Sequence, residues 1–188
     1  MRDDDPGQQC DPVPGRVEGE ASIDLLIEVA PDSREVELIA EAFGFEAPDP
    51  HGRSKADRAM AETIAKTDLP ADPKERRTAL NAMLKPLVDR AVAACVQARQ
   101  TALRSDEAGA KLANAQIEGG YWLTPLEDAA NHWAVESARL QLTAYEAAQA
   151  AHGAGRAIEF AKRDEPWRPS NVDEDVDALI AAQRALAR

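Results

Sequence analysis

The feature that most constrains the fold is a pair of long stretches, 73–118 and 125–152, in which small or apolar residues recur every three or four positions. In the first stretch these residues are Leu80, Leu84, Leu87, Ala91, Ala94, Ala98 and Ala102, and in the second they are Leu126, Ala130, Trp133, Ser137, Leu140, Ala144, Ala147 and Ala151. Such spacing places one stripe along one face of an α-helix. Because Gly119 and Gly120 separate the stretches, the sequence predicts an antiparallel helical hairpin, and the width of its apolar face predicts a bundle around it.

Both stretches open with the same start signal, in which a capping side chain is followed by proline and, three residues after the cap, by glutamate. The residues are Asp72, Pro73 and Glu75 in the first stretch and Thr124, Pro125 and Glu127 in the second. Inside the first stretch, Pro86 predicts a kink near Lys85. After the second, Gly153 and Gly155 predict either a break or bend beyond residue 152, or a continuous helix that packing holds together.

Three shorter helices are expected around the hairpin. One starts at residues 31–35 and runs to Phe43, one starts at Ser54, and one follows Ser170. The inner face expected for the second consists of Ala56, Ala59, Met60, Thr63 and Ile64. Residues 23–29 alternate between apolar and other side chains, which fits a strand, whereas Ser22 before them suits the start of a short helix. A helix is slightly preferred because no partner strand is predicted elsewhere.

The expected fold class is all-α: a helical bundle built on a long antiparallel helical hairpin, with one short N-terminal strand as the open alternative. The expected organisation is a disordered acidic tail at 1–21, a small N-terminal unit at 22–50 and a helical bundle domain at 51–188. A segment rich in proline and glycine, 44–52, separates the last two.

Charge is distributed unevenly along the 188-residue chain, whose formal net charge is −12. Residues 1–50 contain 14 acids and 3 bases, whereas residues 51–120 contain 9 acids and 12 bases. This asymmetry predicts either a charged partner or docking of one segment on another. No apolar run approaches the ~20 residues that cross a bilayer, and the acidic start differs from that of a signal peptide. A cytoplasmic protein that does not contact membranes is therefore expected.

Catalytic and metal-binding motifs are scarce. Asp128, His132 and Glu136 follow one another at four-residue steps, so they share a helix face on which a carboxylate and an imidazole are spaced to bind a divalent metal. Charge pairing on a solvated helix face explains the same pattern more simply. The two cysteines, Cys10 and Cys95, form neither a disulfide framework nor a metal-binding spacing. We therefore expect no cofactor and no enzymatic activity.

A basic stripe, which consists of Arg76, Arg90, Arg104 and Lys111, is expected along one face of the first hairpin helix. A stripe of this kind follows phosphate groups in nucleic-acid-binding proteins. The strongly acidic net charge opposes association with nucleic acid. An internal acidic partner or a second protein is the preferred interpretation.

The remaining candidates are exposed apolar or aromatic residues that would suit a protein partner. They are Ile23, Leu25, Ile27, Trp122, Trp167, Leu179 and Ile180. For Trp167, which lies between Pro166 and Pro169, pinning of the last loop is an equally good interpretation. The expected function is a non-catalytic protein–protein interaction module, adaptor or subunit of an assembly, with homodimerisation plausible. The alternatives are an acidic inhibitor or nucleic-acid mimic and a metal-dependent helical enzyme.

Overall fold

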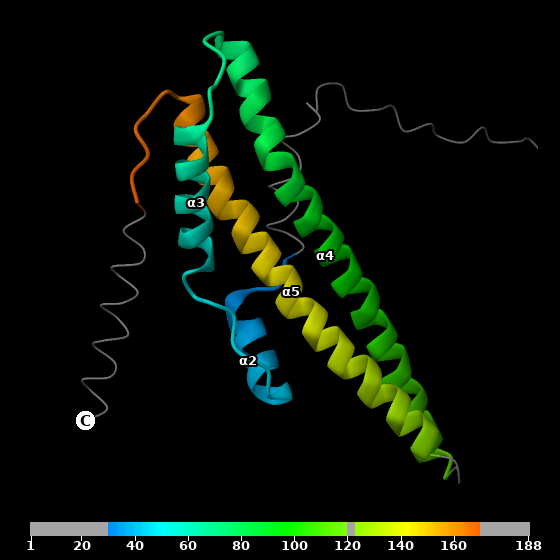
Figure 1. The fold of residues 1–188 in the computed structure, drawn as a ribbon. Helices are drawn as coiled ribbons and strands as arrows, with labels where there is room; N and C mark the ends of the chain where they lie inside the picture. Colours follow the sequence, from blue (N-terminus) through cyan, green and yellow to red (C-terminus); the bar gives the residue numbers. More distant parts are fainter. Residues whose placement is uncertain (1–29, 120–122, 170–188) are drawn as a thin grey trace, which may run out of the picture.

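The fold is described by a computed structural model, in which residues 30–119 and 123–169 are placed (Figure 1). It contains the helices α2 (Ser33–Phe43), α3 (Gly52–Lys66), α4 (Pro73–Ile117) and α5 (Thr124–Lys162). These placed residues include no strand, and α4 and α5 run antiparallel along most of their lengths. The all-α fold and the long hairpin predicted from the sequence are therefore confirmed. The ambiguous segment 23–29 and the predicted helix after Ser170 lie outside the described residues.

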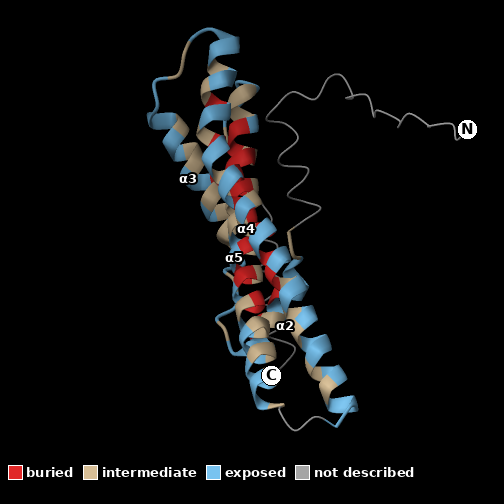
Figure 2. Ribbon diagram, turned by 90° about the vertical axis from the view of Figure 1, so that its right-hand side faces the viewer, coloured by how far each residue is buried: buried red, intermediate tan, exposed pale blue. Residues whose placement is uncertain are grey.

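The core lies along the seam between α4 and α5, where the predicted stripes meet (Figure 2). Its buried residues are Leu80, Leu84, Val88, Ala91, Cys95 and Ala98 from α4 and Leu140, Ala144, Ala151, Ala154 and Ile158 from α5. The many alanines allow the two helix axes to approach closely, because little side-chain volume separates them. The stability of the hairpin therefore depends on many small contacts rather than on a few large side chains.

Of the two helix caps predicted for the hairpin, at Asp72 and at Thr124, the structure contains the first. Asp72 caps α4, because its Oδ1 accepts hydrogen bonds of 2.9 Å from the backbone amides of Lys74 and Glu75. The cap predicted at Thr124 is wrong: Thr124 is the first residue of α5, and Leu123 before it provides no side-chain acceptor. Within α4, Pro86 lies on the exposed side, and the helix continues through it without interruption.

The glycines near the end of the hairpin do not stop α5, which continues past residue 152 to Lys162. Gly153 is buried, and a Cβ built on it would collide with the backbone carbonyl oxygen of Arg53 and lie 2.9 Å from the backbone nitrogen of Asp57. The α3 backbone therefore packs directly on α5 at this position. The alternative of a continuous helix supported by packing is confirmed, and the physical reason is that only glycine leaves room for α3.

α5 is the central helix of the molecule. Each of α2, α3 and α4 packs on it (Figure 1). The α2 contact consists of Val36 and Ala40 against Leu142, with Phe45 and Tyr145 beside them. Since the shorter helices make their main contacts with α5, the bundle is organised around this one element.

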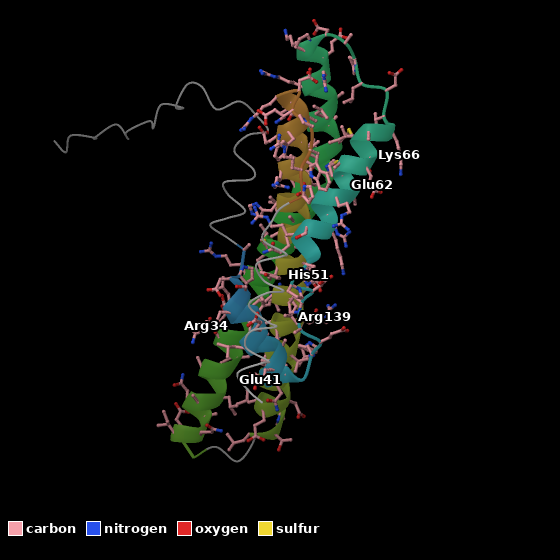
Figure 3. All side chains as sticks on the ribbon, turned by 90° about the vertical axis from the view of Figure 1, so that its left-hand side faces the viewer. Arg34, Glu41, His51, Glu62, Lys66 and Arg139 are labelled. Atoms are coloured by element: carbon pink, nitrogen blue, oxygen red, sulfur yellow. The ribbon has the colours of Figure 1, made fainter. Side chains whose placement is uncertain are left out.

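The predicted inner face of α3 is partly wrong. Met60 and Ile64 do pack toward the core, but Ala59 and Thr63 are exposed, and the only fully buried residue of this helix is Asp57. The helix also starts at Gly52, two residues before the predicted cap. The outward face of α3 is charged. Glu62 and Lys66 point away from the bundle, and 4.0 Å separates Oε2 of Glu62 from Nζ of Lys66 (Figure 3).

Near the turn of the hairpin, α4 and α5 are the only helices among residues 30–119 and 123–169. Among the described residues, none between Thr101 and Ser137 is buried, whereas the opposite half holds the core (Figure 2). Leu103, Ile117 and Val135 are 58%, 84% and 46% exposed there. None of the described helices combines the length and the apolar character needed to cross a membrane.

Candidate interaction surfaces

A groove runs between α2 and α4, and α5 forms its floor. It consists of two adjoining depressions of about 320 and 200 Å³ that share Ala102 and Gln141. Its remaining lining residues are Ala30, Pro31, Glu35, Ile39 and Phe43 on the α2 side, Cys95, Ala98, Arg99, Ser105 and Asp106 on α4, and Ala134, Ser137 and Ala138 on α5. The groove exists because α2 and α4 pack on neighbouring sides of α5, and small side chains line the space between them.

The floor of the groove is apolar but contains one polar pair. Gln141 donates a hydrogen bond of 3.1 Å from Nε2 to Oγ of Ser137, whose side chain is buried. Because both side chains lie in the same depression, the floor offers amide and hydroxyl groups as well as alanine methyl groups. A partner therefore meets a surface that combines close packing with a fixed hydrogen-bonding group.

The rim of the groove carries charges of both signs. Glu35 and Arg99 border the first depression, and Asp106 borders the second. Cys95 of α4 lines the first depression, and burial raises the pKa of its thiol. The thiol therefore stays protonated near neutral pH, which makes it a packing group rather than a nucleophile.

The basic stripe is in part engaged within the molecule. Nη1 of Arg76 lies 2.9 Å from Oδ1 of Asp164, which follows α5. The guanidinium of Arg104 lies 5.3 Å from the centre of the Trp133 ring, over an open depression of about 390 Å³ that Lys111 also borders. Arg90 is exposed. Two of the four predicted cations, Arg76 and Arg104, thus make contacts within the molecule, and the partner of the stripe as a whole stays a prediction.

The structure places the metal candidates on the outer face of α5. Asp128 and His132 are exposed, and Glu136 is paired with Arg139 through hydrogen bonds of 2.6 and 3.1 Å. The hydrogen bond from Arg139 lowers the pKa of Glu136, as expected for a surface ion pair. In the described part of the chain, no three His, Cys, Asp or Glu residues come close enough together to hold a metal ion.

A polar cluster that sequence patterns did not predict joins α3 to α5. Asp57 is 2% exposed and accepts a hydrogen bond of 2.8 Å from Nε1 of Trp167 and a short ion-pair hydrogen bond from Arg156. Arg156 also donates a 2.9 Å hydrogen bond to the carbonyl oxygen of Arg168 and lies 5.0 Å from the Phe160 ring. The indole of Trp167 thus connects the last loop to α3, and its role in binding a partner stays a prediction.

Asp57 and Arg156 escaped prediction because they are 99 residues apart and belong to no periodic pattern. The one available signal was the pair of glycines around Ala154, which indicated a close helix contact in this region. The remaining partner-binding candidates, Ile23, Leu25, Ile27, Trp122, Leu179 and Ile180, lie outside the described residues.

Comparison of the chain with known protein families, curated proteins and solved structures found no match. The fold and its surfaces define the class: an all-α bundle in which a central helix packs against a long antiparallel partner and two short helices. The function is therefore inferred from the chemistry of the surfaces.

Proposed function

We propose that this protein is a non-catalytic protein–protein interaction module, an adaptor or a subunit of a larger assembly, and that the groove between α2 and α4 is its binding surface. The observation that carries the proposal is the groove itself, in which alanine-lined depressions adjoin one another beside exposed Phe43 and Leu38. Exposed apolar side chains beside a polar rim are typical of sites that bind another protein.

The proposed occupant is a helix of another protein with small residues on its contact face. α5 already accepts α3 in this way at Gly153, where backbones approach closely. The groove floor is also built from small residues, among them Ala102 and Ala138. Charge complementarity requires an anionic side chain opposite Arg99 and cationic side chains opposite Glu35 and Asp106.

An acidic inhibitor has less support from the folded part of the chain. Residues 30–119 and 123–169 contain 22 acids and 18 bases, so their net charge is −4 out of the −12 of the whole chain. Mimicry of nucleic acid requires acids arrayed on an ordered surface, whereas here bases are interspersed with acids. The protein-binding groove is therefore the preferred proposal.

The groove is tested by affinity capture from an extract of the native host with three baits: the unchanged chain, Ala102→Glu and Ala110→Glu. Ala102 lies in the groove, whereas Ala110 is an exposed alanine of the same helix outside it. A partner that binds in the groove must be captured about tenfold less by Ala102→Glu, which corresponds to ~1.4 kcal/mol, and equally well by Ala110→Glu.

Circular dichroism of the three baits checks that the helices are retained. Sedimentation equilibrium shows whether a second copy of the chain is the captured partner. Proteins that bind all three baits equally, or a loss of binding with Ala110→Glu alone, would contradict the proposed location of the site.

A further inference from the structure

The loop that follows α5, residues 163–169, folds back over the bundle and is called the strap below. Asp164 at its start has a positive φ of 58° and pairs with Arg76 at the first turns of α4. Trp167 then donates its indole N–H to Asp57 of α3, and the carbonyl oxygen of Arg168 accepts from Arg156 of α5. The strap therefore contacts three helices through charged or polar groups.

α3 is held to the bundle by one buried polar cluster, by close backbone packing at Gly153 and by a small apolar contact. Its only fully buried residue is Asp57, and its apolar contacts with the core come from the partly buried Met60 and Ile64. A buried carboxylate is unfavourable unless hydrogen-bond donors satisfy it. The packing of α3 on α5 is therefore favourable only while Arg156 and Trp167 both contact Asp57.

The position of α3 and the position of the strap depend on each other. If the strap lifts away, Oδ1 of Asp57 loses its Trp167 donor and Arg156 loses the Arg168 carbonyl oxygen. If α3 lifts away, the indole N–H of Trp167 and the guanidinium of Arg156 lose their acceptor. Since each movement deprives Arg156 and one other member of the cluster of a hydrogen-bond partner, neither element gains from staying in place alone.

We infer that α3 and the strap form one releasable cover on α5, which opens as a unit and exposes the face around Gly153. This cover is separate from the proposed groove, which lies between α2 and α4 on another part of α5. Opening leaves the contacts between α4 and α5 in place, because the buried residues of that core belong to those two helices, and it withdraws from the core only the partly buried Met60 and Ile64 of α3. Local opening of this kind is typical of segments held by few apolar contacts.

The first test is hydrogen–deuterium exchange of the full chain, compared with Trp167→Phe and with Trp133→Phe as the matched control. The Trp167→Phe change retains an aromatic ring but removes the N–H donor together with part of the ring area, and Trp133→Phe removes the same atoms elsewhere. Peptides from residues 52–66 are expected to exchange about fivefold faster in Trp167→Phe, while peptides from residues 80–98 and 33–43 keep their rates. The control should leave residues 52–66 unchanged.

The second test starts from the other side of the cover. Gly153→Ala places a methyl group against the α3 backbone, so α3 must move, and exchange in residues 163–169 is expected to rise although no strap residue is altered. Gly109→Ala, at a helical glycine with open space around it, serves as control. Unchanged exchange in the strap, or equal acceleration in every helix, would overturn the inference.

Discussion

Asp57 shows how one charged residue determines the position of a whole helix. Its carboxylate is removed from water and satisfied by two donors that arrive from different parts of the chain, Arg156 and Trp167. A buried ion pair of this kind contributes little net stability compared with apolar residues, but its loss leaves a charge uncompensated. The residue therefore specifies where α3 sits more than it strengthens the fold.

Removal of the Asp57 carboxylate should lower the free energy of unfolding. Asp57→Ala leaves Arg156 and Trp167 without an acceptor, and we expect a loss of about 2–3 kcal/mol, reduced by the partial exposure of Arg156. Urea denaturation monitored by circular dichroism measures this loss of unfolding free energy. The Trp167→Phe change should have a much smaller effect when added to Asp57→Ala than when made alone, since both remove the same contact. Full additivity would contradict the shared role.

His152 should make stability depend on pH. Burial, together with the positive charge of nearby Arg53, lowers the pKa of this imidazole below its usual 6.5. The unfolded chain therefore binds a proton more readily than the folded chain at pH values just below 6.5, so the free energy of unfolding falls as pH drops through that range. More than about one pH unit above 6.5 both forms are neutral and this contribution is constant.

The measurement is urea denaturation between about pH 7.5 and pH 5.5 for the unchanged chain and for His152→Gln. The variant should show a shallower decline of stability at the acidic end, because its side chain takes up no proton. Parallel curves for the two proteins would exclude His152 as a source of the slope.

Among the helices, α4 is notable because it tolerates proline in its interior. Pro86 lacks the amide that would bond to the preceding turn, yet α4 continues on both sides of it within a 45-residue helix. Packing against α5 compensates, since Leu84 and Val88 beside the proline are both buried. The element is therefore stable despite its local sequence.

Pro86→Ala should stabilise the protein. Alanine restores the missing amide and is ~3 kcal/mol more favourable than proline inside a helix, and we expect a gain of about 2 kcal/mol in unfolding free energy. Thermal denaturation should show a midpoint about 4–8 °C higher. Pro73→Ala is the control, because Pro73 is at the first position of α4, where proline is well tolerated. An equal shift for both variants would refute the explanation.

The two halves of the hairpin should respond differently to truncation. Leu84 is 7% exposed in the core, whereas Leu103 is 58% exposed near the turn. Leu84→Ala is expected to cost about 2–4 kcal/mol, and Leu103→Ala less than about 0.5 kcal/mol. Chemical denaturation of both variants tests this difference. A similar loss for the two would mean that the end near the turn is packed as tightly as the core.

Considered as a whole, the molecule shows which features follow from sequence periodicity. The hairpin was predictable because stripes such as Leu80 to Ala98 repeat the helical period without interruption. Leu80, Leu84, Ala91 and Ala98 of that stripe are buried, and Leu87 and Ala94 are partly buried. Periodicity did not locate the inner face of α3, because its buried residue, Asp57, is charged and requires a donor 99 residues away. The groove was also unpredictable, since it depends on how α2 and α4 are placed around α5.

The order of the helices along the chain has a consequence for biosynthesis. α2, α3 and α4 leave the ribosome before α5, yet all three make their principal contacts with it. Until residues 124–162 have been translated, the alanine-rich face of α4 has no surface to cover it. The nascent chain therefore stays unfolded or is bound by a chaperone until then. Ribosome-stalled chains that end before residue 124 should therefore remain protease-sensitive, and resistance should arise abruptly once α5 has cleared the exit tunnel.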